Sequence, residues 1–93
     1  MKSVYNVSYD LNKIGKDYTG LHAELKRTPG YYHLLGSTWL LATTETASQI
    51  FDRLRFHIDS NDNILIAEIT KNNSGWLPTA AWKWISENLQ QLA

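Results

Sequence analysis

Residues 31–43 read Tyr31-Tyr32-His33-Leu34-Leu35-Gly36-Ser37-Thr38-Trp39-Leu40-Leu41-Ala42-Thr43, and this stretch decides the fold. Two apolar runs, residues 31–35 and 38–43, flank the dipeptide Gly36-Ser37. Aromatic and aliphatic runs around a short turn that contains glycine are typical of a β-hairpin. The middle of the chain is therefore predicted to form two consecutive antiparallel strands.

The sequence before this hairpin predicts a strand and then a helix. Residues 4–9 alternate strictly between two faces, which is typical of a half-buried strand. Asp17 can cap a helix over residues 18–27, and Pro29-Gly30 stops it.

The sequence after the hairpin predicts a helix, a strand and a final helix. Thr46 and Gln49 form a capping-box pattern, and the apolar stripe that follows runs to Ile58. Residues 64–69 are an apolar run of strand length. A last amphipathic helix is predicted with Thr79 as its cap.

This order predicts an α+β fold, a ferredoxin-like βαββαβ sandwich with an extra C-terminal helix. We expect a single domain over residues 1–93, with its core in residues 3–70 and a helical extension over residues 76–93. Right-handed crossovers place the first and third strands side by side in the centre of the sheet, with two helices on one face. The tryptophan-rich last helix is expected to cover the other face, either of its own sheet or of a dimer partner.

Length and composition narrow the function classes. The chain has 93 residues and no cysteine, so neither a second core nor a disulfide is available, and a homodimer is the expected supplement to stability. The sequence shows no signal-peptide core and no run of membrane-spanning length, which predicts a cytoplasmic protein with no membrane partner. Nine basic and nine acidic residues cancel, which counts against non-specific nucleic-acid binding.

Asp10 is the candidate catalytic residue and metal ligand. It stands at the carboxyl end of a predicted central strand, where two copies of the chain could bring their carboxylates together. A hard divalent cation such as Mg²⁺ would relieve the repulsion between them and could activate water. The alternative is that Asp10 accepts hydrogen bonds from the turn amides of Leu11 to Lys13.

Basic and aromatic residues around the first two helices form a candidate nucleic-acid strip. Its basic members are Lys13, Lys16, Lys26, Arg27, Arg53 and Arg55, and its nearby tyrosines are Tyr18, Tyr31 and Tyr32. The alternative is that these charges belong to ordinary solvated helix faces.

Two other polar patterns in the sequence do not predict a metal site. Residues 59–63 begin like a calcium loop, but Ile64 stands where that loop requires glycine, so a polar turn is predicted. His22, His33 and His57 share no ligand spacing, and each is interpreted as a surface or half-buried residue.

Three short segments resemble a known family. Tyr9-Asp10-Leu11, Ser37-Thr38-Trp39 and Asp62-Asn63-Ile64 are similar to motifs of the small CRISPR-associated adaptation protein, the non-integrase partner in spacer acquisition. The runs over residues 7–12 and 59–62 look still more like its uncharacterised SinR-family bacterial homologues. VapD-type toxin ribonucleases belong to the same broad fold group. The resemblance covers residues 3–70.

The resemblance implies a ferredoxin-like homodimer in which Asp10 matches a metal-associated aspartate and Trp39 matches the aromatic of a Ser-x-Phe motif. Trp39 is therefore expected among the nucleic-acid-binding residues. Metal-dependent cleavage of RNA or DNA is attributed to some members, while others act as structural nucleic-acid-binding dimers. The leading hypothesis is therefore a weak Mg²⁺-dependent endonuclease. The alternative is a non-catalytic dimeric module that binds nucleic acid or a protein partner, within a mobile-element or toxin–antitoxin system.

The chain departs from that family at two places. Only Lys26 and Arg27 close the first helix, where the family often has an arginine-rich helix. A tryptophan-rich helix stands where the family commonly has a strand that completes the partner's sheet. The second departure affects the dimer geometry, and with it any metal shared between two Asp10 residues.

Overall fold

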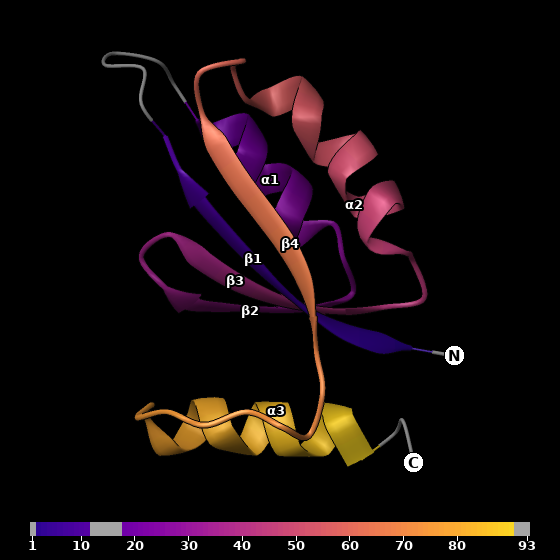
Figure 1. Cartoon of the computed structure of the whole chain (residues 1–93), viewed down its shortest axis with the longest axis vertical. Coiled ribbons are helices and arrows are strands. Elements are labelled where there is room, and N and C mark those ends of the chain that lie inside the picture. The colour runs from indigo at the N-terminus through magenta and orange to yellow at the C-terminus, as the bar shows by residue number, and fades with distance from the viewer. Residues whose placement is uncertain (1, 12–17, 91–93) are drawn as a thin grey trace.

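The structure is a four-stranded antiparallel sheet with helices on both faces (Figure 1). It is a computed structural model that describes residues 2–11 and 18–90. The elements in chain order are β1 (Ser3–Asp10), α1 (Thr19–Lys26), β2 (Gly30–Leu35), β3 (Thr38–Thr43), α2 (Ala47–Leu54), the 3₁₀ turn η1 (Arg55–His57), β4 (Asn63–Ile69) and α3 (Thr79–Gln90).

The strand order is β2-β3-β1-β4, and every neighbouring pair is antiparallel. The α+β class is therefore confirmed, and so is the prediction that the first and third strands lie together in the middle of the sheet. Of the helices in the described part of the chain, none combines the length and the apolar character needed to cross a membrane.

The hairpin of β2 and β3 forms as predicted, with its turn at Gly36-Ser37. Its register shifts between His33 and Leu35, so Leu35 faces Thr38 while His33 faces Trp39. Such a bulge re-aims the side chains beside it.

Strand β1 is buried on both faces, and its alternating side chains enter two separate cores. Towards α1 and α2, one core contains Tyr5, Val7 and Tyr9. On the opposite face, Val4 packs with residues of β3 and α3. The other buried members of the first core are Leu21, Leu25, Trp39, Leu41, Ile50 and Leu54.

Helix α3 packs on the sheet of its own chain, which resolves one alternative left open by the sequence. Ile85 and Leu89 contact Leu40 and Ala42 in the second core, beneath the sheet in Figure 1. This packing covers the end of the face that carries Val4.

The helix boundaries differ slightly from the prediction. The capping box of α2 is confirmed, since Thr46 Oγ1 accepts from the Gln49 N–H at 3.2 Å and Gln49 Oε1 accepts from the Thr46 N–H at 2.8 Å. The helix ends at Leu54 and continues as a 3₁₀ turn, because the backbone is already extended at Ile58. Thr79 lies within α3 rather than capping it, since the Pro78 carbonyl accepts the first helical bonds. The predicted cap Asp17 lies outside the described residues.

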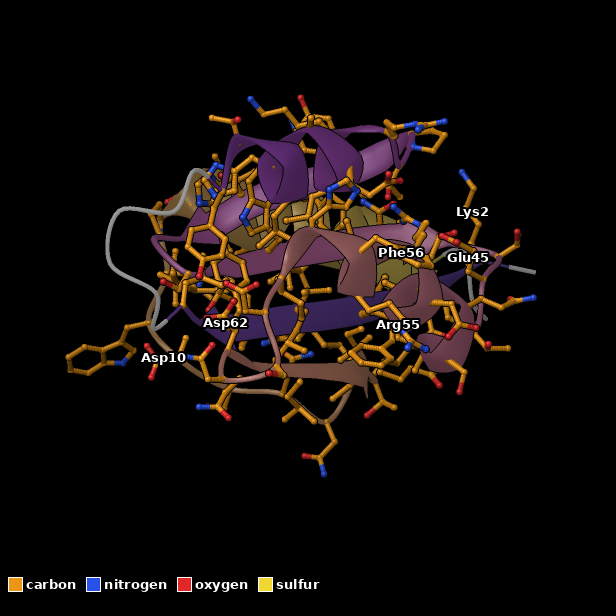
Figure 2. All side chains as sticks on the ribbon, turned by 90° about the horizontal axis from the view of Figure 1, so that it is seen from above. Lys2, Asp10, Glu45, Arg55, Phe56 and Asp62 are labelled. Atoms are coloured by element: carbon orange, nitrogen blue, oxygen red, sulfur yellow. The ribbon has the colours of Figure 1, made fainter. Side chains whose placement is uncertain are left out.

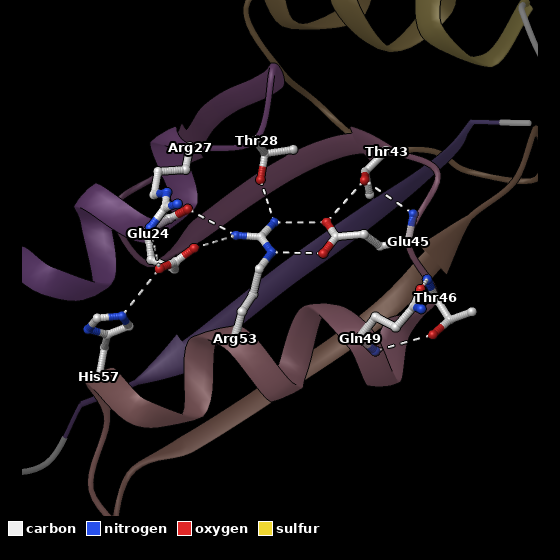
Figure 3. Close-up of polar contacts among 9 residues, drawn as sticks. All are labelled: Glu24, Arg27, Thr28, Thr43, Glu45, Thr46, Gln49, Arg53 and His57. Carbon is white, nitrogen blue, oxygen red and sulfur yellow. Dashed lines mark hydrogen bonds and ion pairs between the residues drawn. The ribbon is translucent and has the colours of Figure 1, made fainter.

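Arg53 of α2 joins the elements on the helical face (Figure 3). Its Nε and Nη2 donate to the two carboxylate oxygens of Glu45 at 2.9 and 3.0 Å. Nη1 donates to the Glu24 carbonyl oxygen at 3.0 Å, and Nη2 also donates to Thr28 Oγ1. The guanidinium thus connects the end of α1 with the loop before α2, which explains why it is not a free surface cation.

Gly20 has a packing reason to be in α1, where glycine weakens the helix. A Cβ at this position would lie 2.9 Å from Nδ1 of His57, whose Nε2 is 3.4 Å from a Glu24 carboxylate oxygen. The absence of a side chain therefore lets η1 approach α1 closely.

We expect Arg53→Met to lower the free energy of unfolding by about 2 kcal/mol at pH 7, because it leaves polar partners without their donor. Arg53 holds the pKa of the Glu45 carboxyl below its ordinary 4.5, so this stabilisation is lost as the pH falls through the lowered value. The difference between wild type and variant should therefore shrink on acidification. Urea unfolding followed by circular dichroism at several pH values measures it.

The control for this prediction is Lys83→Met, which removes an exposed cation of α3. It should change stability by less than about 0.5 kcal/mol. Equal losses for the two variants would contradict the role given to Arg53.

Candidate functional site

The three segments that carry the family resemblance meet at one end of the sheet. Asp10 of β1 pairs with Asn63 of β4, and the Tyr9 N–H donates to the Ser37 carbonyl oxygen at 3.1 Å. Residues that are far apart in the sequence therefore form one contiguous region, which we call the motif end of the sheet.

On the sheet face that α3 packs against, the part of β1 at the motif end carries polar side chains. Ser8 Oγ donates to Asn6 Oδ1 at 2.7 Å and lies 3.4 Å from Thr38 Oγ1 on the neighbouring strand. Asp10 follows on the same face by strand parity. These side chains form a row of hydrogen-bonding groups next to the area that α3 covers.

Asp10 is exposed at the end of this row, as Figure 2 shows. It lines an open groove of about 320 Å³ together with Ser8, Asn63 and Leu65. The alternative role for Asp10, as an acceptor for turn amides, involves Asn12 and Lys13, which lie outside the described residues.

The described residues of the motif end do not by themselves supply the ligands for a magnesium site. Mg²⁺ prefers six oxygen ligands in octahedral geometry. Within residues 2–11 and 18–90, no group of three or more His, Cys, Asp or Glu side chains is placed to hold a metal ion. A metal at Asp10 would require further ligands besides the described carboxylates, including water.

Asp62 has a structural role that its sequence context did not indicate. It is buried, and both carboxylate oxygens accept from the Tyr18 hydroxyl at 3.0 Å. One of them also accepts from the Asp59 N–H at 2.8 Å. This confirms the polar turn predicted for residues 59–63 and ties it to the start of α1.

Trp39 is not placed to stack on nucleic acid, which corrects the prediction for this residue. Its side chain is 1% exposed and points into the core beneath α1 and α2, away from the face that carries Asp10. Indole has only a donor, and Trp39 Nε1 uses it on the Tyr9 hydroxyl at 3.0 Å.

The Tyr9 hydroxyl lies between Trp39 and His22 and links them. Its oxygen accepts from Trp39, and it is 3.2 Å from His22 Nε2. Tyr9 can donate to that nitrogen only while the imidazole is neutral. Burial lowers the pKa of His22 below its ordinary 6.5, and the charges of His33 and Lys26 act in the same direction, so the neutral ring is favoured.

His33 completes this aromatic cluster from the edge strand β2. Its ring stacks on Trp39 with centroids 4.0 Å apart, and it is 6.0 Å from the ring of His22. The cluster was not found from the sequence, because its members lie on four elements and share no spacing. The sequence signal was the shared parity of His33 and Tyr31 on β2, whose rings both lie against Trp39.

Lys26 and Arg27, two basic residues of the predicted strip, do not lie beside Asp10. Lys26 and Arg27 end α1 just before Gly30, which lies level with Val4 at the opposite end of β1. Six residues of strand separate the two ends by about 20 Å. Arg27 is 3.7 Å from a Glu24 carboxylate oxygen. Lys13 and Lys16 lie outside the described residues.

No protein-family model matches this chain, and no solved structure is significantly similar to it. The similarity to the CRISPR-associated family therefore rests on the short motif segments alone.

We expect Tyr9→Phe to lower the free energy of unfolding by about 2 kcal/mol, because the buried Trp39 N–H loses its acceptor. Urea unfolding measures the loss, and the indole N–H resonance of Trp39 should shift in an NMR spectrum. Tyr31→Phe, at a tyrosine that is 41% exposed, is the control and should be nearly neutral. Equal stability of the Tyr9 variant and wild type would show that this bond contributes little.

Proposed function

We propose that this protein is a non-catalytic protein-binding module of ferredoxin-like topology. The order β2-β3-β1-β4 supports this topology, because each of two strand–helix–strand units skips one strand position. Both crossover helices contribute to the same core, as right-handed connections require.

The exposed Trp76 is the observation that carries the binding function. Its side chain is 100% exposed, whereas the next residue, Leu77, packs against the core beneath the sheet. Tryptophan is enriched among the residues that dominate the energy of protein interfaces. A large apolar side chain held at the surface by a partly buried neighbour is suited to anchoring a partner.

A groove lies between α3 and the segment that carries Trp76. It has a volume of about 370 Å³, and Trp82, Ile85 and Leu89 form its apolar wall. Lys71 and Asn73 line its other side, where Asn73 Nδ2 donates to the Thr70 carbonyl oxygen at 2.8 Å. Figure 1 shows this segment running alongside α3.

The chemistry of the groove indicates what kind of segment it would bind. Its apolar wall accepts an aliphatic or aromatic side chain, and the Lys71 ammonium favours a carboxylate beside it. We therefore propose a partner segment that carries an apolar residue next to Asp or Glu.

The groove can be tested with a phage-displayed peptide library panned against the protein. We expect selected peptides to combine an apolar and an acidic residue, and Lys71→Glu, which reverses the cation that lines the groove, to weaken their binding at least about tenfold. Lys83→Glu, at an exposed lysine of α3 that does not line the groove, should leave affinity unchanged. Failure to select any peptide, or equal losses for both variants, would reject this surface.

We also propose a relation to the CRISPR-associated adaptation superfamily and its SinR-family homologues. The meeting of the three motif segments at one end of the sheet supports it. Nucleic-acid binding receives less support, because Lys26 and Arg27 are remote from that end and the net charge of the chain is zero.

Metal-dependent cleavage of RNA or DNA is the second candidate function. The observation that favours it is the exposed carboxylate of Asp10 at the end of a central strand. Phosphoryl transfer usually relies on several metal ligands or cationic groups to stabilise charge, and a single carboxylate supplies only one metal ligand.

Because one carboxylate leaves most of a Mg²⁺ shell to water, we expect no saturable NMR shift at Asp10 below millimolar Mg²⁺ or Mn²⁺. We also expect RNA and DNA to remain intact with the wild type and with Asp10→Asn. Asp52→Asn, at an exposed aspartate of α2, is the control. Saturable shifts or cleavage that disappear only in Asp10→Asn would favour the nuclease.

A further inference from the structure

Strand β4 forms one edge of the sheet, and its outer side pairs with no other strand in the described part of the chain. Proteins usually protect such edges with proline, lysine or a bulge. The strand Asn63–Ile69 contains no proline and no lysine, and its pairing with β1 runs without a register shift. The backbone of this edge is therefore suited to pairing with a further strand.

Apolar side chains flank this edge on both faces of the sheet. On the α3 side, Leu65 is 67% exposed. On the α2 side, Phe51 is 39% exposed and lines a groove of about 360 Å³ with Ile64 and Ile66. A strand that paired with β4 would therefore bury apolar surface on both faces while it satisfied backbone groups.

The half of this edge that runs from Ile66 to Glu68 is acidic. Glu68 is the one charged residue of β4, and it shares the α2 face with Ile66 by strand parity. Asp52 of α2 lines the groove next to Ile66. Both carboxylates are exposed, so each can meet a cation on a strand that pairs with β4.

The other half of the edge carries charges of both signs. Arg55 lines a groove of about 420 Å³ together with Asp59, Asp62 and Ile64. Its guanidinium carbon lies 5.9 Å from the centre of the Phe56 ring, and Figure 2 labels both residues. Four strand positions, about 13 Å, separate Ile64 from Glu68. Arg55 therefore does not offset the acidic half.

We propose that the outer edge of β4 binds an extended segment of another protein that carries a basic residue followed by apolar residues. The segment pairs antiparallel to β4, as every other pair in this sheet does. Its basic side chain lies opposite Glu68, and its apolar side chains lie opposite Ile66, Leu65 and Ile64. This site is separate from the groove at Lys71 and does not rest on it. Because the groove at Lys71 favours an acidic segment, the protein would link two segments of opposite charge.

The charges favour another protein over a second copy of this chain. A second β4 brings no lysine or arginine to the edge, because its only charged residue is Glu68. It would also bring a second Asp52 to the α2 side, and a second Arg55 only together with the Asp59 and Asp62 of the same groove. Unlike charges opposite one another stabilise a strand pair, whereas like charges destabilise it. A basic segment satisfies this rule at Glu68.

A designed peptide tests the proposal. Its residues in order are arginine, threonine, valine, leucine, isoleucine and two threonines, so that the arginine lies opposite Glu68. A matched peptide has glutamate in place of the arginine. We expect saturable binding of the arginine peptide, measured by fluorescence anisotropy with a dye-labelled peptide, and binding of the glutamate peptide that is about fivefold weaker or more.

Glu68→Arg should reverse this preference, because the variant places a cation opposite the peptide's arginine and an attractive partner opposite its glutamate. The side chain is exposed, so the variant should fold. Glu87→Arg, at an exposed glutamate of α3, is the matched control and should leave both affinities unchanged. Lys71→Glu, which reverses the cation of the other groove, should not weaken binding of the arginine peptide.

Methylation of the peptide backbone distinguishes strand pairing from binding in the groove alone. The N–H groups of an extended segment point alternately towards and away from the strand with which it pairs. Methylation of one alternate set of nitrogens should abolish binding, and methylation of the other set should leave it within a few-fold.

The absence of saturable binding up to millimolar peptide would overturn the proposal. Equal binding of the arginine and glutamate peptides to the wild type, or equal effects of the two methylation patterns, would also overturn it. Sedimentation of the wild type completes the test, since a dimer that the peptide does not dissociate and that Glu68→Arg changes would assign this edge to a second copy. None of these results depends on peptide binding in the groove at Lys71.

Discussion

The double burial of β1 is the constraint on which the rest of this structure depends. Because its side chains alternate, one set must be covered by α1 and α2 and the other by something else. Helix α3 covers part of this second set by packing against Val4 and its neighbours on β3. This arrangement lets a chain of 93 residues cover one face of its sheet and part of the other without a disulfide.

Helix α3 does not reach the whole face, and the uncovered part divides into two chemically different regions. Along β1 the row is polar, is partly buried at Asn6 and Ser8, and ends at the exposed Asp10, whereas along β4 the face carries the exposed Leu65. The polar row suits hydrogen bonding and the apolar edge suits association. The two regions therefore differ in the kind of partner that each could bind.

The order of elements and most of their bounds could be predicted from the sequence, because local signals specify them. The alternation of β1, the capping box at Thr46 and the turn at Gly36-Ser37 each depend on neighbouring residues. The sites could not be predicted in the same way. Trp39 carried the expected motif, yet whether an indole is buried depends on which face of β3 the helices cover. The contact of Tyr18 with Asp62 spans 44 positions, so no local pattern indicates it.

The two cores on opposite sides of the sheet are unequal in size. Nine buried residues hold α1 and α2, but only five hold α3, which is connected through the irregular segment after β4. Local opening free energies follow the amount of buried contact. Helix α3 should therefore detach before the sheet unfolds and uncover the strip formed by Val4, Leu40 and Ala42. The face of the sheet that carries α1 and α2 is thus the more stable one. On the other face, loss of α3 on heating would expose apolar surface that can associate with other chains.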